Sequence, residues 1–405
     1  MLKGKKVVLG ITAGIAAYKA AEFVRLLAKE EVEVHVVMTQ NAQKFITPLT
    51  FQTLSGNPVV SDPFVLLEEA QIGHIALADL GELVVIIPAT ANIIGKIANG
   101  IADDFLSTMV MATKAPVLFV PSMNVNMWEN KTLQKNIQIL IERGYHLLDP
   151  GEGELACHWY GKGRLPDLNE VVEKMEDLLT PKDLKGERIL ITGGPTQEPM
   201  DPVRFITNRS SGKMGYALAK IARRRGAEVI FISGPTSLSL SRRDIKYVPV
   251  RTAEEMRKAV FAHIEGSSVV IKAAAVSDYR PKVISERKIK KGDSDYTLAL
   301  EKTKDILEEL GKKKENRILV GFAAETEDLM AHAKKKLQEK NLDLIVVNDV
   351  TQPGAGFGLD TNQVKILYPS GQVKDLPLTT KEETSQVILD NVVALLKKKE
   401  GSRKK

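Results

Sequence analysis

A strand, a glycine-containing turn and a helix follow one another at two places in this sequence, and this repetition constrains the fold most strongly. The first copy has an apolar strand from Lys5 to Gly10, a turn of small residues, and then apolar positions at helical spacing. The second copy begins at Arg188 and continues into a helical pattern over residues 213–225. Each copy leads into a further strand, at 32–38 and 228–233. The sequence therefore predicts two separate α/β domains.

Nearly continuous apolar runs predict further strands that are buried on both faces, as in a parallel sheet covered by helices. These runs are residues 83–88, 117–120, 268–271, 318–322 and 344–347. Residues 364–368 and the segment from Gln372 flank Pro369-Ser-Gly371, which predicts an antiparallel hairpin. We expect doubly wound sheets in both domains, with the hairpin as an extension of the second.

A polar, proline-containing segment separates the two patterns. A helical run ends near Leu179 and is followed by Thr180-Pro-Lys-Asp-Leu-Lys-Gly186. We therefore predict domains at 1–180 and 188–396, a linker at 181–187 and a basic tail at 397–405.

Charge and composition exclude several classes of protein. The formal net charge is +6, but the tail alone holds six basic residues and one Glu, so the rest of the chain is almost neutral. We expect no nucleic-acid partner and a frayed tail that serves solubility. No apolar run approaches the ~20 residues of a membrane helix, and Met1 to Lys6 does not resemble a signal peptide. We expect a cytoplasmic protein without membrane contact. Cys157 is the only cysteine, which excludes an intrachain disulfide.

Small and polar residues follow several of the predicted strands. Gly14 lies between a strand and a helix, where backbone N–H groups favour a phosphate, although a tight turn explains the pattern about as well. Residues 88–92, 96–104 and 106–108 form similar loops. Doubly wound folds bind ligands at the carboxyl ends of their strands, so these loops together suggest a phosphorylated aromatic cofactor.

Three single residues have side chains that could take part in catalysis. His74 lies among apolar neighbours, where a structural histidine is the more common case. Asn124 follows a buried strand and could bind a carboxylate, although a cap or turn role is the default there. Cys157 lies in a glycine-rich segment, 151–163, which indicates a mobile flap more than a packed core.

Motifs across the whole chain resemble a known enzyme family. The first group contains Gly14-Ile-Ala-Ala-Tyr-Lys19, Phe45-Ile-Thr-Pro-Leu49, Gly73-His-Ile75, Pro88-Ala-Thr-Ala-Asn92, Pro121-Ser-Met-Asn-Val-Asn-Met-Trp128 and Leu155-Ala-Cys157. Their order is similar to that of the homo-oligomeric flavin-containing cysteine decarboxylases. The segment Ile191 to Gly215 resembles the signature of phosphopantothenate cysteine ligase. The fused order resembles the bacterial bifunctional phosphopantothenoylcysteine decarboxylase and phosphopantothenate cysteine ligase of coenzyme A biosynthesis.

For the first domain, the resemblance implies a Rossmann-like, flavodoxin-like flavoprotein that decarboxylates phosphopantothenoylcysteine. It implies a catalytic histidine at His74, an amide on the departing carboxylate at Asn124, a flap acid at Cys157 and a substrate contact at Met127. The residues implied around FMN are Gly14, Ile15, Thr39, Ala89, Thr90, Ser107 and Thr108. The sequence departs from the family pattern at Ile93, where threonine is frequent, and at His158, where glycine is frequent.

For the second domain, the resemblance implies a Rossmann-like ligase that uses CTP and Mg²⁺. Arg204, Asn208 and Lys288 match positions that take part in catalysis. The implied substrate-binding residues are Gly193, Gly194, Ser211, Gly212, Lys272, Ala273, Ala274, Asp278, Asp305, Ile306, Phe322, Lys336 and Lys340. Without the resemblance, the last two lysines would be a solvated helix face, and a turn role would be the default for Asn208. No metal ligands are assigned.

The resemblance thus implies an enzyme that joins cysteine to 4'-phosphopantothenate through an acyl cytidylate and decarboxylates the product to 4'-phosphopantetheine. It also implies a homo-oligomer, a dodecamer built from trimers and dimers. A nicotinamide-dependent oxidoreductase is the rival enzyme, but Val37-Met-Thr-Gln40 offers no acidic residue for a ribose. A flavin-binding regulatory subunit is the non-enzymatic rival, and the presence of His74, Asn124 and Cys157 together argues against it.

Overall fold

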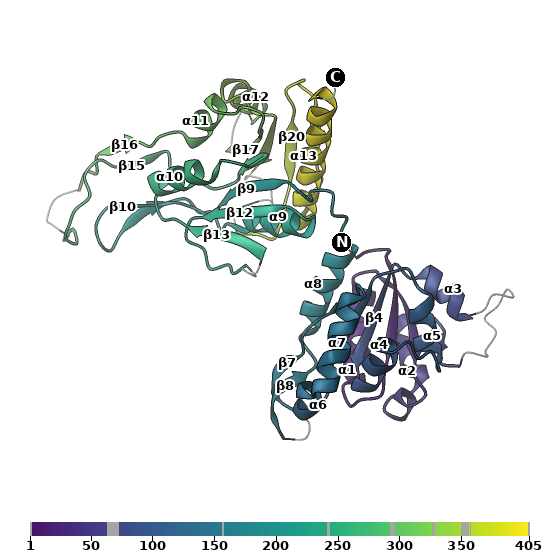
Figure 1. The fold of residues 1–405 in the computed structure, drawn as a ribbon. Helices are drawn as coiled ribbons and strands as arrows, with labels where there is room; N and C mark the ends of the chain where they lie inside the picture. Colours follow the sequence, from purple (N-terminus) through teal and green to yellow (C-terminus); the bar gives the residue numbers. More distant parts are fainter. Residues whose placement is uncertain are drawn as a thin grey trace. The chain divides into compact units, whose positions relative to one another are not determined.

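The chain divides into two compact units, Met1–Thr180 and Pro181–Lys405 (Figure 1). The computed structural model describes residues 2–62, 73–155, 158–240, 244–291, 296–325, 329–349, 356 and 358–403. Each unit has its own sheet and its own hydrophobic clusters. The prediction of an α/β fold with parallel sheets in both halves is confirmed.

The first unit is built on a parallel six-stranded sheet with the order β3-β2-β1-β4-β5-β6. Its strands are β1 (Lys6–Ile11), β2 (Glu33–Met38), β3 (Val59–Val60), β4 (Leu83–Ala89), β5 (Val117–Pro121) and β6 (His146–Leu147). The chain order reverses between β1 and β4, so the carboxyl ends of these two strands form the switch point where doubly wound folds bind ligands.

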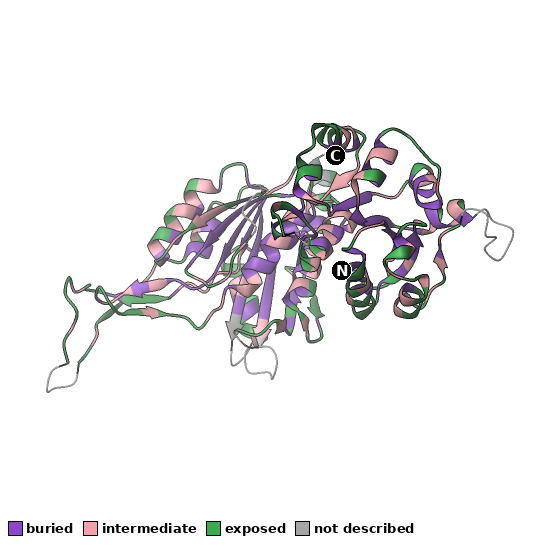
Figure 2. Cartoon of the chain, turned by 90° about the horizontal axis from the view of Figure 1, so that it is seen from below, coloured by how far each residue is buried: buried purple, intermediate pink, exposed green. Residues whose placement is uncertain are grey.

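Helices cover both faces of this sheet, which explains why its central strands are apolar throughout. Val7, Leu9 and Ile11 of β1 pack on one face, whereas Val8 packs on the other. The first face carries α1 (Ala17–Lys29), α2 (Pro48–Ser55) and α8 (Leu168–Leu179). The second face carries α3 (Gly73–Leu80), α4 (Ala91–Ala98), α5 (Phe105–Ala112) and α7 (Lys131–Glu142). Figure 2 shows the buried strands between exposed helix faces.

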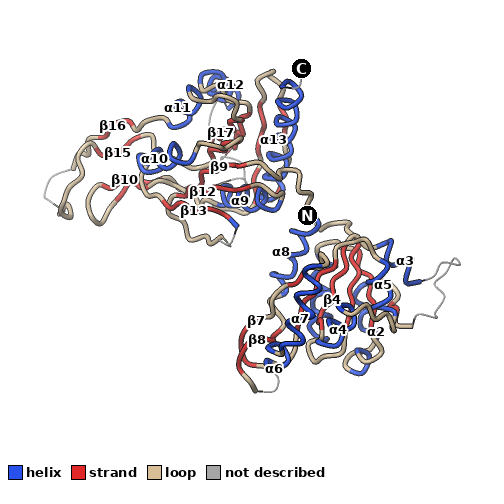
Figure 3. Tube along the Cα trace, viewed as in Figure 1, coloured by secondary structure: helices blue, strands red, loops and turns tan. Residues whose placement is uncertain are grey.

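A two-stranded hairpin extends from the first unit next to the short helix α6 (Val125–Glu129) (Figure 3). It consists of β7 (Gly151–Glu154) and β8 (Tyr160–Arg164), paired antiparallel. We call β7, β8 and the segment between them the flap. The segment that the sequence predicts as mobile therefore begins and ends as paired strands.

The second unit is built on an eight-stranded sheet with the order β13-β12-β9-β14-β17-β18-β20-β21. Its parallel strands are β9 (Arg188–Gly193), β12 (Glu228–Ser233), β13 (Ile245–Pro249), β14 (Val269–Lys272), β17 (Ile318–Glu325) and β18 (Leu344–Asp349). The antiparallel strands β20 (Val364–Leu367) and β21 (Val373–Asp375) extend one edge, which confirms the predicted hairpin. One face packs α9 (Lys213–Arg224) and α13 (Lys381–Arg403). The other packs α10 (Ala253–His263), α11 (Ile306–Lys312) and α12 (Leu329–Glu339).

Short antiparallel pairs complete the second unit. β10 (Gln197–Pro199) pairs with β11 (Phe205–Thr207), and β15 (Tyr279–Pro281) pairs with β16 (Leu300–Lys302). These two pairs lie beside each other and extend away from the main sheet, and we call them the arm (Figure 3). A further pair joins β19 (Thr361–Asn362) to β22 (Thr379–Thr380) at the start of α13.

Two features of the second unit differ from the sequence-based expectations. Leu184, in the predicted linker, is fully buried in the core of the second unit, and Asp183 accepts two hydrogen bonds from Arg225. Residues 397–403 of the predicted tail are helical rather than frayed, because α13 continues to Arg403. Lys399 in that last stretch donates to the backbone carbonyl of Arg317. In the described part of the chain, no helix is long and apolar enough to cross a membrane.

Candidate active sites

A pocket of about 720 Å³ opens at the switch point of the first sheet. Gly14 and Ile15 from the β1–α1 turn, Thr90 from the end of β4, and Asn124 and Met127 from the β5–α6 segment line it. The flap contributes residues 154–155, 158 and 163–164. Five of the residues predicted from three distant motifs therefore lie around one cavity.

Hydrogen bonds join the strand ends beneath this pocket. Thr12 donates from Oγ1 to the carbonyl of Pro88 at 2.6 Å and accepts from the Thr90 backbone N–H at 3.3 Å. The Ser122 N–H donates to the carbonyl of Ala89 at 3.2 Å. Hydrogen bonds thus connect the carboxyl ends of β1, β4 and β5, and these bonds fix the loops that follow the three strands.

The flap is attached to the β5–α6 segment by a close backbone approach. The Met123 N–H donates to the carbonyl of Gly163 at 2.9 Å. A Cβ on Gly163 would lie 2.2 Å from the Met123 carbonyl oxygen, and one on Gly161 would lie 2.8 Å from a Val125 methyl group. Only glycine permits this approach, so the glycines of the flap fix its base rather than merely loosening it.

Asn124 is the N-cap of α6, and its Oδ1 accepts from the Asn126 N–H at 2.8 Å. The cap role expected by default is therefore present, and it fixes the plane of the side-chain amide at the edge of the pocket. Met127 is 48% exposed and lines the pocket, whereas the adjacent Trp128 is in the core.

The other predicted FMN residues lie at the same edge of the sheet but do not line this pocket. Thr39 follows β2, and Ala89 is fully buried at the end of β4. Ser107 forms a capping box with Asp104, and Thr108 Oγ1 donates to the Asp104 carbonyl at 2.8 Å. Both hydroxyl groups thus stabilise the start of α5.

His74 is also outside the pocket. It is the second residue of α3, and its ring packs edge-on against Phe105 with centroids 6.2 Å apart. Its Nδ1 is buried and has no hydrogen-bond partner among the described residues. A buried nitrogen without a partner is costly in a purely structural histidine, and this favours a role towards a bound group. Cys157, the predicted flap acid, lies outside the described residues.

His158 adopts φ +61°, in the left-handed region that glycine tolerates best. Its Nδ1 lies 3.3 Å from Glu154 Oε1 across the flap. The departure from the family pattern at this position therefore falls where a side chain strains the backbone.

A larger pocket, of about 980 Å³, lies at the carboxyl edge of the second sheet. Twelve predicted residues line it, from five separate segments of the chain. They are Asn208, Ser211, Gly212, Lys272, Ala273, Ala274, Asp278, Asp305, Ile306, Phe322, Lys336 and Lys340.

The charges in this second pocket are strongly coupled. Lys340 donates to Asp305 Oδ2 at 2.6 Å. The pKa of Lys272 is lowered to about 8, chiefly by burial; Lys340 and Lys336 also lower it, whereas Asp305 and Asp278 raise it. Burial alone would raise the pKa of Asp305, but Lys340 and the Glu308 N–H hold it below its usual value. Three lysines with one paired carboxylate form a site that favours a polyanion.

Two predicted glycines support this pocket from below. A Cβ on Gly193 would lie 2.6 Å from the Phe231 ring, and one on Gly194 would lie 2.9 Å from the carbonyl oxygen of Gly234. Gly212, at φ +80°, lies against Gly194 and opens α9 into the pocket. Gly193 and Gly194 therefore permit close packing against β12 and the residues that follow it, with the start of α9 beside them, and they do not line the pocket as predicted.

Arg204 and Lys288 lie in or beside the arm and do not line this pocket. Arg204 makes two hydrogen bonds to Asp201 Oδ2 and a third, from Nη2, to the Ile289 carbonyl. Asp201 is fully buried, and it also accepts from the Ile289 N–H at 3.1 Å. Despite this burial, the donors around Asp201 hold its pKa well below the usual range. One carboxylate thus fixes Arg204 and the loop that carries Lys288.

Several residues of the second pocket were missed by the sequence analysis. Lys213, the first residue of α9, donates to Asp360 at 2.7 Å. Lys381, the first residue of α13, donates to the Thr361 carbonyl, and its burial beside Lys213 lowers its pKa. Asn362 is 3% exposed, and its Oδ1 has no partner among the described residues. Only Lys213 carried a signal, as the residue directly after Gly212 in the signature.

Comparisons with known proteins agree with this division into two sites. Residues 1–180 match the family model described as Flavoprotein. Residues 184–396 match the model described as DNA/pantothenate metabolism flavoprotein C-terminal domain. The fold and sites therefore define a flavoprotein unit followed by a pantothenate-metabolism unit.

Curated relatives extend over the whole chain. The coenzyme A biosynthesis bifunctional protein CoaBC of Bacillus subtilis (strain 168) is 48% identical over 98% of this chain and 98% of that protein. The protein of the same name from Escherichia coli (strain K12) is 44% identical over 97% of each. A crystal structure of a CoaBC C-terminal domain covers 54% of this chain and 99% of that one, at 45% identity and a TM-score of 0.46. The chain belongs to the family of coenzyme A biosynthesis bifunctional proteins CoaBC.

Proposed function

We propose that the second unit joins cysteine to 4'-phosphopantothenate with CTP and Mg²⁺, and that the first unit decarboxylates the product to 4'-phosphopantetheine with FMN, in the cytoplasm. The observation that carries this proposal is that each unit has a pocket at the carboxyl edge of its sheet, lined by residues of the corresponding motif. The relation to bifunctional proteins of coenzyme A biosynthesis over 98% of the chain supports the pairing of the two activities.

The first pocket has features that fit FMN. α1 begins at the pocket without a side-chain cap and without an acidic residue in its first turn, and this leaves its positive end available to a phosphate. Gly14 and Ile15 in the preceding turn, with Thr90 across the pocket, would hold the cofactor. The buried Nδ1 of His74 provides a further polar contact. When bound, FMN would supply reversible oxidation of the substrate thiol, which creates the electron sink that loss of CO₂ requires.

The chain's own residues would position the reacting groups and control protons. The side chain of Asn124, which is fixed at the pocket edge by its capping hydrogen bond, would bind the carboxylate that leaves as CO₂. Cys157 would then donate a proton to carbon, and the flap that carries it would exclude water. The hydrogen bond from the Met123 N–H to the Gly163 carbonyl keeps this flap next to Asn124.

The second pocket would hold the triphosphate of CTP near Lys272, Lys336 and Lys340. A carboxylate oxygen of 4'-phosphopantothenate attacks the α-phosphorus of CTP, and pyrophosphate leaves. The amine of cysteine then attacks the acyl carbon, CMP leaves, and the amine loses a proton. Asn208, whose Nδ2 donates to the Ala275 carbonyl, would act in this second half-reaction.

Mg²⁺ fits this pocket as a partner of the nucleotide. The described residues contain no group of three or more His, Cys, Asp or Glu side chains that could hold a metal ion by themselves. Mg²⁺ is commonly bound by one or two carboxylates together with substrate phosphates, and Asp278 offers a carboxylate at the pocket.

A homo-oligomer, with trimers through the first unit and dimers through the second, forms part of the proposal. His74 does not line the pocket that contains Asn124, and Lys288 does not line the pocket that contains Asn208. A second copy could bring these groups to the sites. Exposed apolar side chains on and beside the arm, including Val283 and Ile284, support an interface there.

The test is product analysis by mass spectrometry with the purified full chain. With 4'-phosphopantothenate, cysteine and CTP, we expect 4'-phosphopantetheine, CMP and pyrophosphate, and a yellow protein that contains FMN. An Asn208→Asp variant should accumulate the acyl cytidylate, and added phosphopantothenoylcysteine should still be decarboxylated. A colourless protein that takes up no FMN would contradict the first assignment, and equal use of ATP would contradict the preference for CTP.

A further inference from the structure

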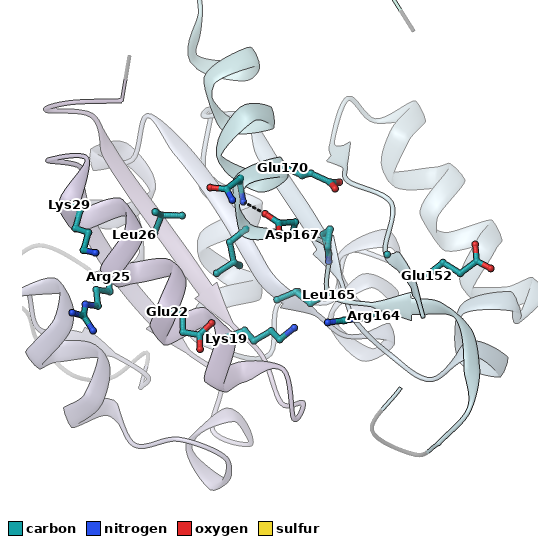
Figure 4. Close-up of a pocket in the computed structure, with 14 residues that line it drawn as sticks. Lys19, Glu22, Arg25, Leu26, Lys29, Glu152, Arg164, Leu165, Asp167 and Glu170 are labelled. Atoms are coloured by element: carbon teal, nitrogen blue, oxygen red, sulfur yellow. Dashed lines mark hydrogen bonds between the residues drawn. The ribbon is translucent and has the colours of Figure 1, made fainter. Parts of the chain in front are cut away.

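Two cavities of the first unit meet at three residues. The pocket beside Asn124 continues into a groove of about 830 Å³ between α1 and the start of α8. The two cavities share Lys19, Arg164 and Leu165 in their linings. Figure 4 shows Lys19 and Arg164 reaching toward one another from α1 and from the end of β8.

The two cations at this junction form no ion pair in the described part of the chain. Neither side chain forms an ion pair or hydrogen bond with a described residue. By contrast, the partly buried Lys96 and Lys340 are paired, with Asp103 and Asp305 respectively. Two neighbouring positive groups that are not paired with a carboxylate favour an anion between them, and a phosphate monoester with almost two negative charges suits them well.

The rest of the groove differs in charge from the junction of the two cavities. The rest of the groove is lined by charges of both signs (Figure 4): the acidic residues are Glu22, Glu152, Asp167 and Glu170, and the basic ones are Arg25 and Lys29. The four carboxylates outnumber the two cations there, whereas the junction of the two cavities is lined by two cations and Leu165. The junction is therefore the part of the groove that suits an anion best.

Leu165, the third shared residue, is 4% exposed and adds an apolar surface beside the two cations. In 4'-phosphopantothenoylcysteine, the phosphate is separated by one methylene group from a carbon with two methyl groups. A pair of cations next to an apolar side chain is complementary to this end of the molecule.

We propose that Lys19 and Arg164 bind the 4'-phosphate of the decarboxylase substrate, and that Leu165 contacts its geminal dimethyl group. This inference rests on the proposed decarboxylase function. The extended substrate spans about 13 Å from phosphorus to the α-carbon of cysteine, so its two ends need separate contacts. Asn124 receives the carboxylate, and the junction receives the phosphate.

The test compares a phosphorylated and a non-phosphorylated substrate with the full-length holoenzyme. We expect Lys19→Met and Arg164→Gln each to lower kcat/KM for 4'-phosphopantothenoylcysteine about ten- to hundredfold relative to that for pantothenoylcysteine. Arg164→Lys should recover part of this preference. Lys29→Met is the matched control, because Lys29 is on the same helix and lines only the groove; it should keep the wild-type ratio.

Binding of the products provides a readout independent of turnover. Calorimetry should show that Lys19→Met raises the Kd of 4'-phosphopantetheine about ten- to hundredfold. The ratio of the Kd of pantetheine to that of 4'-phosphopantetheine should fall accordingly. Flavin absorbance per chain, measured on the same samples, should equal that of the wild type. Loss of flavin with an unchanged preference would mean that these cations hold the phosphate of FMN, and would overturn the proposal. An unchanged preference with full flavin would overturn it too, while the decarboxylase function would stand. If the wild type decarboxylates neither substrate, the proposed function fails, and this inference fails with it.

Discussion

Replacement of Gly163 by alanine should separate the two activities of the chain. The new Cβ would lie 2.2 Å from the Met123 carbonyl oxygen, about 1 Å closer than a normal contact, at a φ of +143°. The base of the flap must therefore move by roughly 1 Å, and its hydrogen bond from the Met123 N–H is weakened or lost. A misplacement of this size can lower a catalytic rate about hundredfold.

The measurement is single-turnover decarboxylation of phosphopantothenoylcysteine, followed by mass spectrometry, with ligation in the same sample as the internal reference. We expect decarboxylation to fall about hundredfold. Ligation should remain at the wild-type rate, since it belongs to the other unit.

A matched control distinguishes the close contact from backbone strain. Gly153 on the partner strand β7 has a similar φ, +155°, but its nearest neighbour to a new Cβ is a flexible Arg164 side-chain atom at 3.5 Å. Gly153→Ala should therefore carry the strain without displacing the flap base, and should reduce decarboxylation only modestly. Equal rates for both variants, or a wild-type rate for Gly163→Ala, would refute the argument that this contact positions the flap.

Three further predictions concern the second unit. Asp201→Asn should lower the rate of ligation at least about tenfold while the KM for CTP changes little, because the carboxylate positions Arg204 and the adjacent loop and does not contact the nucleotide. Steady-state kinetics measures both quantities, and an unchanged rate would contradict this positioning role. Lys272 loses its charge in the free protein above about pH 8, so the contribution of Lys272 to the Kd of CTP should be constant below about pH 7 and should raise the Kd above about pH 8. The Lys272→Arg variant keeps its charge and should remove this pH dependence in calorimetric titrations. A fragment of residues 181–405 should ligate cysteine, whereas one of residues 188–405 lacks the buried Leu184 and should be less stable by about 2–3 kcal/mol in urea unfolding; equal stabilities would contradict the packing argument.

The main strands of both sheets could be predicted from the sequence because each is covered by helices on two faces. Residues 83–88 and 344–347 are apolar runs for this reason, and both lie within observed strands. Strands without such cover carry no comparable signal. β7 reads Gly-Glu-Gly-Glu, and its pairing depends on backbone contacts to β8 and to Met123 that the sequence does not reveal. The basic composition of the tail predicted fraying, but Lys399 donates hydrogen bonds to backbone carbonyls 82 and 83 residues away, which no local pattern indicates.

The candidate sites divide in the same way. Residues at strand ends, such as Thr90 and Asp278, could be placed at the sites because parallel strands end at one edge of a sheet. The pairing of Lys213 with Asp360, 147 residues apart, depends on loop packing that no local pattern encodes. The cap at Asn124 was the default expectation and is present, whereas the capping box of Ser107 was not anticipated because the same residue was assigned to FMN.

Cap and ligand roles need not compete in the first pocket. Asn124 uses Oδ1 to accept the Asn126 N–H, and a carboxylate would require a donor, which is the Nδ2 end of the same amide. The cap therefore determines which end of the amide is directed away from the helix. The preceding residue, Met123, holds Gly163 of the flap, and Arg164 follows at the junction of the two cavities. A substrate bound at both ends would thus contact the β5–α6 segment and the base of the flap together, on either side of a single backbone hydrogen bond. This arrangement explains why the base of the flap is built from glycines at close contact, and why a displacement there should affect substrate binding and proton delivery at once.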